Sequence, residues 1–365
     1  MNVGNRLRLV VLGSLLIGCV SGEQLPPVPT PDAPPPPIDD DVDDDGVVAA
    51  QDCNDEDDTV FPGALELCDG IDNNCDGIMD ENSASFEDAA GVRDVSNLFT
   101  GTTALPARIT FPTAGKLRLC GASTYFAAIT VVKNLEIVGT GAETSILDGA
   151  GKVRVITTET QGTTTSLRDV RLTNGNSTTG GALYCADTTV DVRDVVISNN
   201  RASGRGAGAA LDRCTSNFNR VTIRDNAGAN GAGLSALSGT ATLTNVTLTK
   251  NAASTVGGAL SSTTGALVNL IDSLVLENSS GNGQGGGVFL DGTVSCNNTT
   301  FNKNTGNGVF LTGNAATFTS TLCSFGTVAA ANNAPADLVP GNSVPLTALN
   351  AGDTVSFNCT STTCQ

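Results

Sequence analysis

A short repeat occupies the second half of this chain and restricts what the chain can fold into. Six apolar residues close alternating, strand-like stretches at separations of 25, 26, 25, 28 and 25 positions, namely Leu172, Ile197, Ile223, Leu248, Leu276 and Phe301. An Asn follows each of them within about three positions, at Asn174, Asn200, Asn226, Asn251, Asn278 and Asn304. A glycine cluster comes next each time, and no helical period is present. This combination is typical of a solenoid.

The size of the repeat predicts how it packs. A unit of about 25 residues with two or three short strands cannot bury its own apolar face, so neighbouring units must stack. We therefore predict an all-β parallel β-helix of about nine or ten coils, with aliphatic residues inside and polar residues outside. The repeated Asn is expected to adopt the left-handed corner conformation and to stack on its copies, while Gly relieves a second corner.

Charge is concentrated in one segment. The formal net charge is −18, and 17 of the 37 acidic residues lie between Asp39 and Glu81, a segment without Lys or Arg. The rest of the chain is close to neutral. A nucleic-acid partner is not expected, because such a partner requires a basic face.

The N-terminus predicts export. Arg6 and Arg8 precede an apolar run from Leu9 to Ile17, which is too short to span a bilayer but is typical of a secretory signal. The run ends in Leu16-Ile17-Gly18-Cys19, which resembles the lipobox of bacterial lipoproteins. That resemblance implies cleavage before Cys19 and lipidation of Cys19. The alternative is an ordinary signal peptide with an incidental cysteine.

These features predict the order of the first segments. Residues 1–18 are expected to be the signal peptide and residues 19–38 a proline-rich, extended tether. A lipid anchor at Cys19 would hold the protein on a membrane of the bacterial envelope, at the outer membrane or the cell surface.

Ten cysteines remain besides Cys19. An even number in an exported chain predicts disulfides, although the sequence alone leaves their connectivity open. Cys359 and Cys364 are near enough in sequence for a small closed loop. A zinc site is the weaker alternative, because the chain contains no His.

Two loops within residues 39–82 have the spacing of EF-hand-type calcium loops without flanking helices. Oxygen ligands at positions 1, 3 and 5, Gly at 6, a backbone carbonyl at 7 and a late carboxylate define such a loop. The first loop offers Asp41, Asp43, Asp45, the carbonyl of Val47, and Asp52; the second offers Asp72, Asn74, Asp76, the carbonyl of Ile78, Asp80 and Glu81. Hard oxygen donors predict Ca²⁺ as the cofactor.

The stretch from Asp52 to Glu81, with Cys53, Cys68 and Cys75 among its residues, resembles the metal-binding motif of MopE-type surface proteins. The label of that family mentions copper, but apart from Met79 this stretch lacks the residues that copper prefers. The resemblance therefore implies metal binding, while the residues favour calcium. A solvated acidic linker is the alternative.

The coils also have a family likeness. Gly-Gly-Ala-Leu stretches after the Asn turns, and the first coils near Leu119–Tyr125 and Leu135–Gly141, resemble pectate-lyase-like right-handed β-helices and polymorphic outer-membrane proteins. We thus predict a small loop-rich calcium-binding segment (39–82), a connector (83–103), a right-handed parallel β-helix (104–328) and a C-terminal cap (329–365).

The sequence favours a protein that is not an enzyme. Asp residues on the coils are scattered and no His supports them, although an Arg base beside a calcium-binding carboxylate cluster would suit a polysaccharide lyase. Outward charges that keep a solenoid soluble are the simpler explanation of Arg193, Arg205 and Arg224. We expect adhesion, binding of a polysaccharide or surface protein, or envelope scaffolding. A lyase or other carbohydrate-active enzyme is the alternative.

Overall fold

A computed structural model describes residues 40–312 and 316–325, together with the backbone of 338–340 and 355–360. The predicted signal peptide, Cys19 and the tether lie outside the described residues, as do most of the predicted cap and Cys364. The described residues from Asp41 onward form one compact unit. In its described part the unit is all-β, and one short 3-10 helix, η1 (Ser96–Phe99), is its only helix. No helix there is long and apolar enough to cross a membrane.

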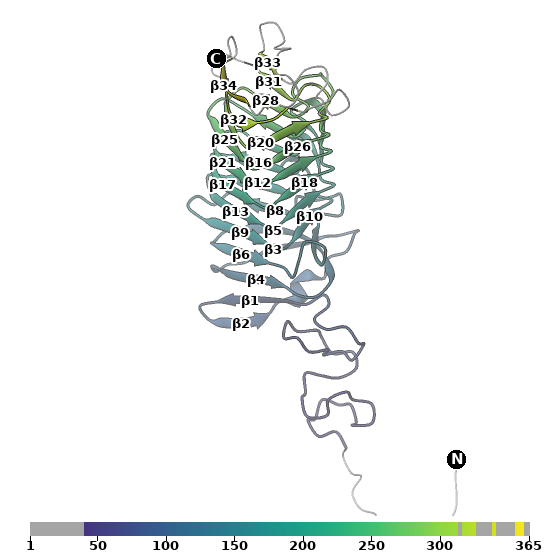
Figure 1. Cartoon of the computed structure of the whole chain (residues 1–365). Coiled ribbons are helices and arrows are strands. Elements are labelled where there is room, and N and C mark those ends of the chain that lie inside the picture. The colour runs from purple at the N-terminus through teal and green to yellow at the C-terminus, as the bar shows by residue number, and fades with distance from the viewer. Residues whose placement is uncertain (1–39, 313–315, 326–337, 341–354, 361–365) are drawn as a thin grey trace, which may run out of the picture. The chain divides into compact units, whose positions relative to one another are not determined.

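The strands form three sheets that run along the coils (Figure 1). The first sheet is parallel except at its two ends, where β2, β1 and β34 pair antiparallel. Its strands in spatial order are β2 (Gly91–Asp94), β1 (Ala84–Asp88), β4 (Gly115–Leu119), β6 (Leu135–Val138), β9 (Thr164–Arg168), β13 (Thr189–Arg193), β17 (Cys214–Asn219), β21 (Gly239–Thr244), β25 (Ala266–Ile271), β29 (Thr293–Asn297), β32 (Thr317–Cys323) and β34 (Val355–Thr360).

The second sheet has two parallel runs that share the long strand β5 (Ser123–Val131). One run continues through β3 (Ala107–Thr110), β8 (Ile156–Thr158), β12 (Leu183–Ala186), β16 (Ala209–Asp212), β20 (Leu234–Ala236), β24 (Leu260–Ser262), β28 (Val288–Leu290), β31 (Val309–Leu311) and β33 (Leu338–Pro340). The other continues through β7 (Ser145–Asp148), β10 (Arg171–Thr173), β14 (Val196–Ser198), β18 (Thr222–Arg224), β22 (Thr247–Thr249), β26 (Leu274–Leu276) and β30 (Thr300–Asn302).

The third sheet is smaller and wholly parallel. It contains β11 (Asn176–Thr179), β15 (Arg201–Arg205), β19 (Ala227–Asn230), β23 (Ala252–Val256) and β27 (Ser279–Ser280). A central coil therefore has four short strands, such as β13 to β16, where two or three were expected. The nine strands from β4 to β32 define about eight turns, slightly fewer than predicted.

A continuous apolar core fills the coils. Inward residues at matching positions of successive strands are almost wholly buried, as in the column Leu172, Ile197, Ile223, Leu248, Val275 and Phe301. Leu276 was predicted for this column, but the register places Val275 there. The predicted assignment was wrong by one residue, which on a strand moves a side chain to the opposite face.

The Asn turn divides its two expected roles between neighbouring residues. Left-handed φ values occur at Asn174, Asn199, Asp225, Lys250, Glu277 and Lys303. The stacked amides belong to the next residue, and they form a buried ladder of Asn200, Asn226, Asn251, Asn278 and Asn304. In this ladder each Nδ2 donates to the Oδ1 of the next coil at 2.9–3.0 Å.

Asn174 is therefore a corner residue, and Gly175 occupies the matching ladder position. The glycine corner behaves as predicted. Gly206, for example, has φ +59°, and a Cβ there would lie 2.3 Å from the carbonyl oxygen of Ala209. Only glycine fits such a position without a shift of the backbone.

Candidate metal centre

The first acidic loop is folded around its own carboxylates. The backbone N–H of Gly46 donates to Asp41 Oδ2 at 2.9 Å, that of Asp45 to Asp43 Oδ1 at 3.2 Å, and that of Val47 to Asp45 Oδ1 at 2.7 Å. Gly46 has φ +95°, which allows the sharp turn at the sixth position. One oxygen of each carboxylate shapes the loop, so the other oxygen is left for a ligand.

These remaining oxygens are buried and without partners. Asp41 Oδ1, Asp43 Oδ2, Asp45 Oδ2 and Asp52 Oδ2 are shielded from solvent and accept no hydrogen bond from the described residues. Carboxylate oxygens of Asp41, Asp43 and Asp45 lie within 4.8 Å of one another. Shielding from solvent raises the pKa of Asp43, and the charges of Asp45, Asp52 and Asp41 raise it further. A bound cation would offset the repulsion among these carboxylates.

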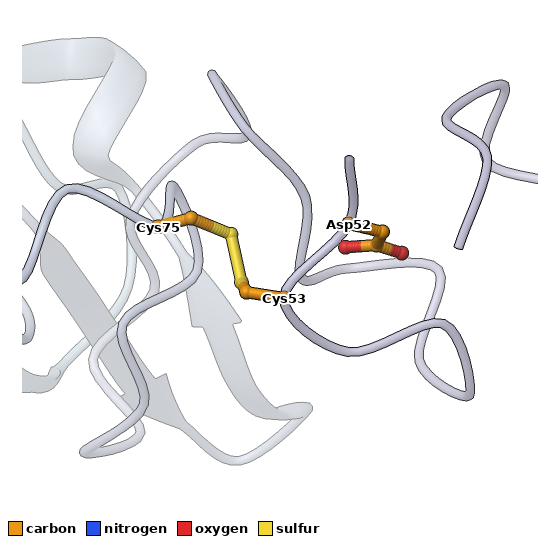
Figure 2. A group of neighbouring side chains, drawn as sticks. All are labelled: Asp52, Cys53 and Cys75. Atoms are coloured by element: carbon orange, nitrogen blue, oxygen red, sulfur yellow. A yellow bond between two sulfur atoms is a disulfide. The ribbon is translucent and has the colours of Figure 1, made fainter. Parts of the chain in front are cut away.

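Asp52 also lies beside two cysteines, Cys53 and Cys75 (Figure 2). Both sulfur atoms are joined in a disulfide, so neither is a thiolate that could bind a metal. The disulfide instead links the residue after the last ligand of the first loop to the middle of the second loop. The role of Asp52 as the last ligand of the first loop stays a prediction.

The second loop repeats the hydrogen-bond pattern of the first. Gly77 N donates to Asp72 Oδ2 at 2.8 Å, Asp76 N to Asn74 Oδ1 at 2.9 Å, and Ile78 N to Asp76 Oδ1 at 2.9 Å. Gly77 has φ +92°. Two loops of unrelated intervening sequence thus share one geometry, which local acidity alone would not produce.

The two late carboxylates of the second loop differ in position. Asp80 Oδ1 accepts the N–H groups of Asp69 and Gly70 at 2.9 and 2.8 Å, so it holds a neighbouring turn. Glu81 Oε1 accepts a hydrogen bond from Asn74 Nδ2 at 2.6 Å, while its Oε2 is buried and unpartnered. Glu81 is therefore the better candidate ligand of the two.

Glu66 lies within the stretch Asp52–Glu81, but the loop spacing does not predict a role for it. Its side chain is 5% exposed and accepts Asn74 N and Asp80 N, each at 2.8 Å. Burial raises the pKa of Glu66, and the charges of Glu81 and Asp72 add to the rise, while the two N–H donors oppose it. Glu66 positions the second loop. A single acidic residue between Leu65 and Leu67 was the only signal in the sequence.

The metal-binding loops are fastened to the first coil. A disulfide joins Cys68 to Cys120, and the hydroxyl oxygen of Tyr125 lies 2.7 and 2.6 Å from the carbonyl oxygens of Ser83 and Cys120, to either of which it can donate its proton. Two further disulfides, Cys185–Cys214 and Cys296–Cys323, lie within the solenoid. The prediction of disulfides is confirmed for these eight cysteines; Cys359 and Cys364 lie outside the residues whose side chains are described.

Several arginines on the coils are engaged in ion pairs, among them Arg224, which was considered for catalysis. Arg213 contacts Asp187 and Asp212 at 2.7 and 2.8 Å, and Arg224 contacts Asp225 at 2.7 Å. The hydrogen bonds from Arg213 lower the pKa of Asp187. These pairs have the geometry of exposed structural contacts.

Arg193 has a different environment. It lines a cavity of about 260 Å³ on the outer face of β6, β9 and β13, together with Glu136, Arg168 and Asp191. Arg168 also pairs with Glu136. Two arginines and two carboxylates are thus brought together on one face of the first sheet.

The part of that face from β17 to β32 is uncharged. We call the outward positions of β17, β21, β25, β29 and β32 the uncharged face. Its residues are Thr215, Asn217, Asn219, Thr240, Thr242, Thr244, Leu267, Asn269, Ile271, Thr293, Ser295, Asn297, Thr317, Thr319 and Thr321. Thirteen of these fifteen side chains carry a hydroxyl or an amide.

One family model matches this chain. Residues 52–81 match the copper-binding MopE model, which is described as a putative metal-binding motif. No curated protein and no solved structure matches the chain. The match includes the second loop and Asp52, whereas Asp41, Asp43 and Asp45 of the first loop precede it. A metal-binding motif joined to a parallel β-solenoid is therefore the identity that the sequence and the fold support together.

Proposed function

We propose that this protein is a lipid-anchored protein of the bacterial envelope whose solenoid binds a partner without catalysing a reaction. The observation that carries the proposal is the uncharged face, because a flat array of hydroxyls and amides offers many hydrogen bonds but no acid, base or nucleophile. Partners of the right kind are a polysaccharide or another surface protein. Four disulfides support export to an oxidising compartment.

The anchor is tested by replacing Cys19 with Ser. We expect the natural chain to incorporate a labelled fatty acid and the C19S variant to incorporate none, because the lipobox-like pattern directs acylation to the thiol of Cys19. Fractionation of cells should then find the variant uncleaved or released from the membrane. Equal label in both proteins would contradict the anchor.

Calcium is the metal we propose for both loops. The available donors are carboxylate, amide and backbone oxygens, and hard oxygen donors favour Ca²⁺. A copper site would use nitrogen or sulfur donors. The side chain of Met79 is 61% exposed and the chain contains no His. Calorimetry on the processed chain should detect Ca²⁺ binding at up to millimolar concentration, and a preference for Cu²⁺ would overturn the assignment.

A polysaccharide lyase is the second candidate, and the cavity at Arg193 favours it. Arg193 or Arg168 could remove a proton from an acidic sugar, while Glu136 or Asp191 could hold a cation against the sugar carboxylate. We expect no turnover, because Glu136 is already paired with Lys116 and Arg168. Formation of unsaturated product that disappears in Arg193→Ala would establish the lyase instead.

A further inference from the structure

The uncharged face differs from the earlier strands of the same sheet. Five successive strands present no charged side chain at their fifteen outward positions. The three preceding strands, β6 to β13, present Glu136, Arg168, Asp191 and Arg193 at equivalent positions. Charged outward side chains therefore end at β13, and the uncharged face beyond it suits a partner without charge.

The central column of this face is held in place before any partner arrives. Ser295 Oγ donates to Asn269 Oδ1 at 2.7 Å, and Asn269 Nδ2 lies 3.5 Å from Thr242 Oγ1. The backbone beneath is fixed by parallel pairing on both sides of β25. Side chains that are already ordered lose little conformational entropy on binding.

Two aliphatic side chains flank the central amide. Leu267, which is 39% exposed, and Ile271 lie on either side of Asn269 on the same strand. A surface that alternates hydroxyls and amides with small apolar spots matches a sugar ring, which has hydroxyls around its edge and C–H groups on its faces. None of the fifteen positions is aromatic, so a single sugar would find no platform on which to stack.

We propose that the uncharged face binds an extended, uncharged polysaccharide that lies across several coils. Each coil would contribute a few weak hydrogen bonds, and the sum over about five coils would give useful affinity. An acidic polysaccharide would find no basic side chain among the fifteen outward positions, and a cationic polymer would be drawn to Asp39–Glu81 instead. This inference rests on the proposed function, since it names the class of partner that the non-catalytic solenoid binds.

The test is co-sedimentation of the processed, Ca²⁺-loaded chain with insoluble polysaccharides. The uncharged probes are cellulose, chitin and starch granules, and the acidic probes are calcium pectate and calcium alginate gels. We expect retention on at least one uncharged polysaccharide and none above background on the acidic gels. Asn269→Asp should weaken that retention by about tenfold, because it removes a donor and places a charge at the contact.

The matched control is Asn230→Asp on β19 of the third sheet, which adds the same charge outside the uncharged face. It should bind as the natural chain does, and thermal unfolding should be alike for both variants. Thr242→Val, which removes one hydroxyl and keeps the shape, should weaken binding by a smaller factor than Asn269→Asp.

Failure to bind any of the three uncharged polysaccharides would overturn this inference, as would equal binding by the natural chain and Asn269→Asp. Either result would leave a non-catalytic solenoid with another partner. Unsaturated product from an acidic polysaccharide would instead overturn the proposed function, so the two failures are distinguishable.

Discussion

The metal-binding segment and the solenoid reach an ordered structure by different means. Among the described residues before Ser83, Val60 is the one buried hydrophobic side chain, and carboxylates hold the chain by accepting backbone N–H groups. The solenoid instead has a continuous apolar core from Ala84 to Phe325 and repeated backbone pairing. A segment without a core relies on hydrogen bonds to its carboxylates and on disulfides, whereas each coil of a solenoid relies on its neighbours in the stack.

The largest expected effect separates the two regions directly. Removal of calcium with a chelator and reduction of the disulfides should unfold residues 41–82 while the central coils stay folded. At a hundredfold excess over its dissociation constant, each calcium contributes about 2.7 kcal/mol. Hydrogen exchange should show loss of amide protection in the two loops. Equal loss of protection in β17 to β25 would show that the regions unfold together.

The Asn ladder gives the next largest effect. Asn226→Ala removes the Nδ2 bonds to Ile197 O and Asn251 Oδ1. It also removes Asn226 Oδ1, which accepts the backbone N–H of Asn200 and is one of three acceptors for Asn200 Nδ2. Unpaired buried amides cost about 1–3 kcal/mol each, so we expect the free energy of unfolding to fall by roughly 2–4 kcal/mol. Denaturant titration measures the change.

Asn174→Ala is the matched control, because Asn174 lies at the corner rather than in the ladder. Its loss should cost roughly 1 kcal/mol, the worth of an ordinary hydrogen bond to a charged group or less. Equal losses in the two variants would contradict the division of roles between the corner residue and the ladder residue.

The second loop allows a smaller and sharper comparison between Glu81 and Asp80. Glu81→Gln should weaken Ca²⁺ binding by about tenfold or more, near 1.4 kcal/mol, because it removes a charged ligand. Asp80→Asn removes the same charge but keeps an oxygen for Asp69 N and Gly70 N, so it should change affinity little. Calorimetry on both variants measures the change in Ca²⁺ affinity. Equal losses of affinity would contradict the assignment of Glu81 as a ligand and of Asp80 as a residue that holds the turn.

The smallest effect concerns the ion pair of Arg220 and Asp194, 2.5 Å apart. Both side chains are partly exposed, so Arg220→Ala should lower the melting temperature only slightly at pH 7. The hydrogen bond from Arg220 lowers the pKa of Asp194 below its ordinary 3.8. The pair therefore stabilises the fold above pH 3.8, and that contribution is lost as the pH falls further.

Thermal unfolding at pH 7 and at pH 2.5 measures the contribution of this ion pair. The difference in melting temperature between the natural chain and Arg220→Ala should be smaller at pH 2.5. Arg205→Ala is a suitable control, since no ion pair of Arg205 is found within the described residues. A larger difference in melting temperature at pH 2.5 than at pH 7 would contradict the downward shift of the Asp194 pKa.

Much of the fold followed from the repeat, and its errors have local causes. The period predicted stacked parallel strands, but Leu274, Val275 and Leu276 are all aliphatic, so alternation could not identify the inward residue. Val275 and Leu276 precede Phe301 by 26 and 25 positions, and both spacings occur in the repeat, so the period did not decide between them either. Likewise, Asn199 and Asn200 stand together, and only the register distinguishes corner from ladder.

The metal loops were predictable where the pattern is local. The residues at positions 1, 3, 5 and 6 of each loop form hydrogen bonds with one another or with the next residue, and both loops have these residues. The roles of Glu66 and Asp80 depend on contacts 8 to 14 residues away, which spacing does not encode. Disulfide pairing also depends on the tertiary fold, because Cys68 reaches Cys120 across the start of the solenoid.

The Asn ladder has a polarity. Every amide in it donates toward the C-terminal coil, so the column is left with a bare acceptor at its first member, Asn200 Oδ1. Gly175 N occupies that acceptor at 2.7 Å. A Cβ at Gly175 would lie 2.1 Å from Gly181 O, so no further Asn fits there. Gene duplication could therefore lengthen this protein by whole coils inserted after Asn200, whereas a coil added before Gly175 would have to begin without the ladder.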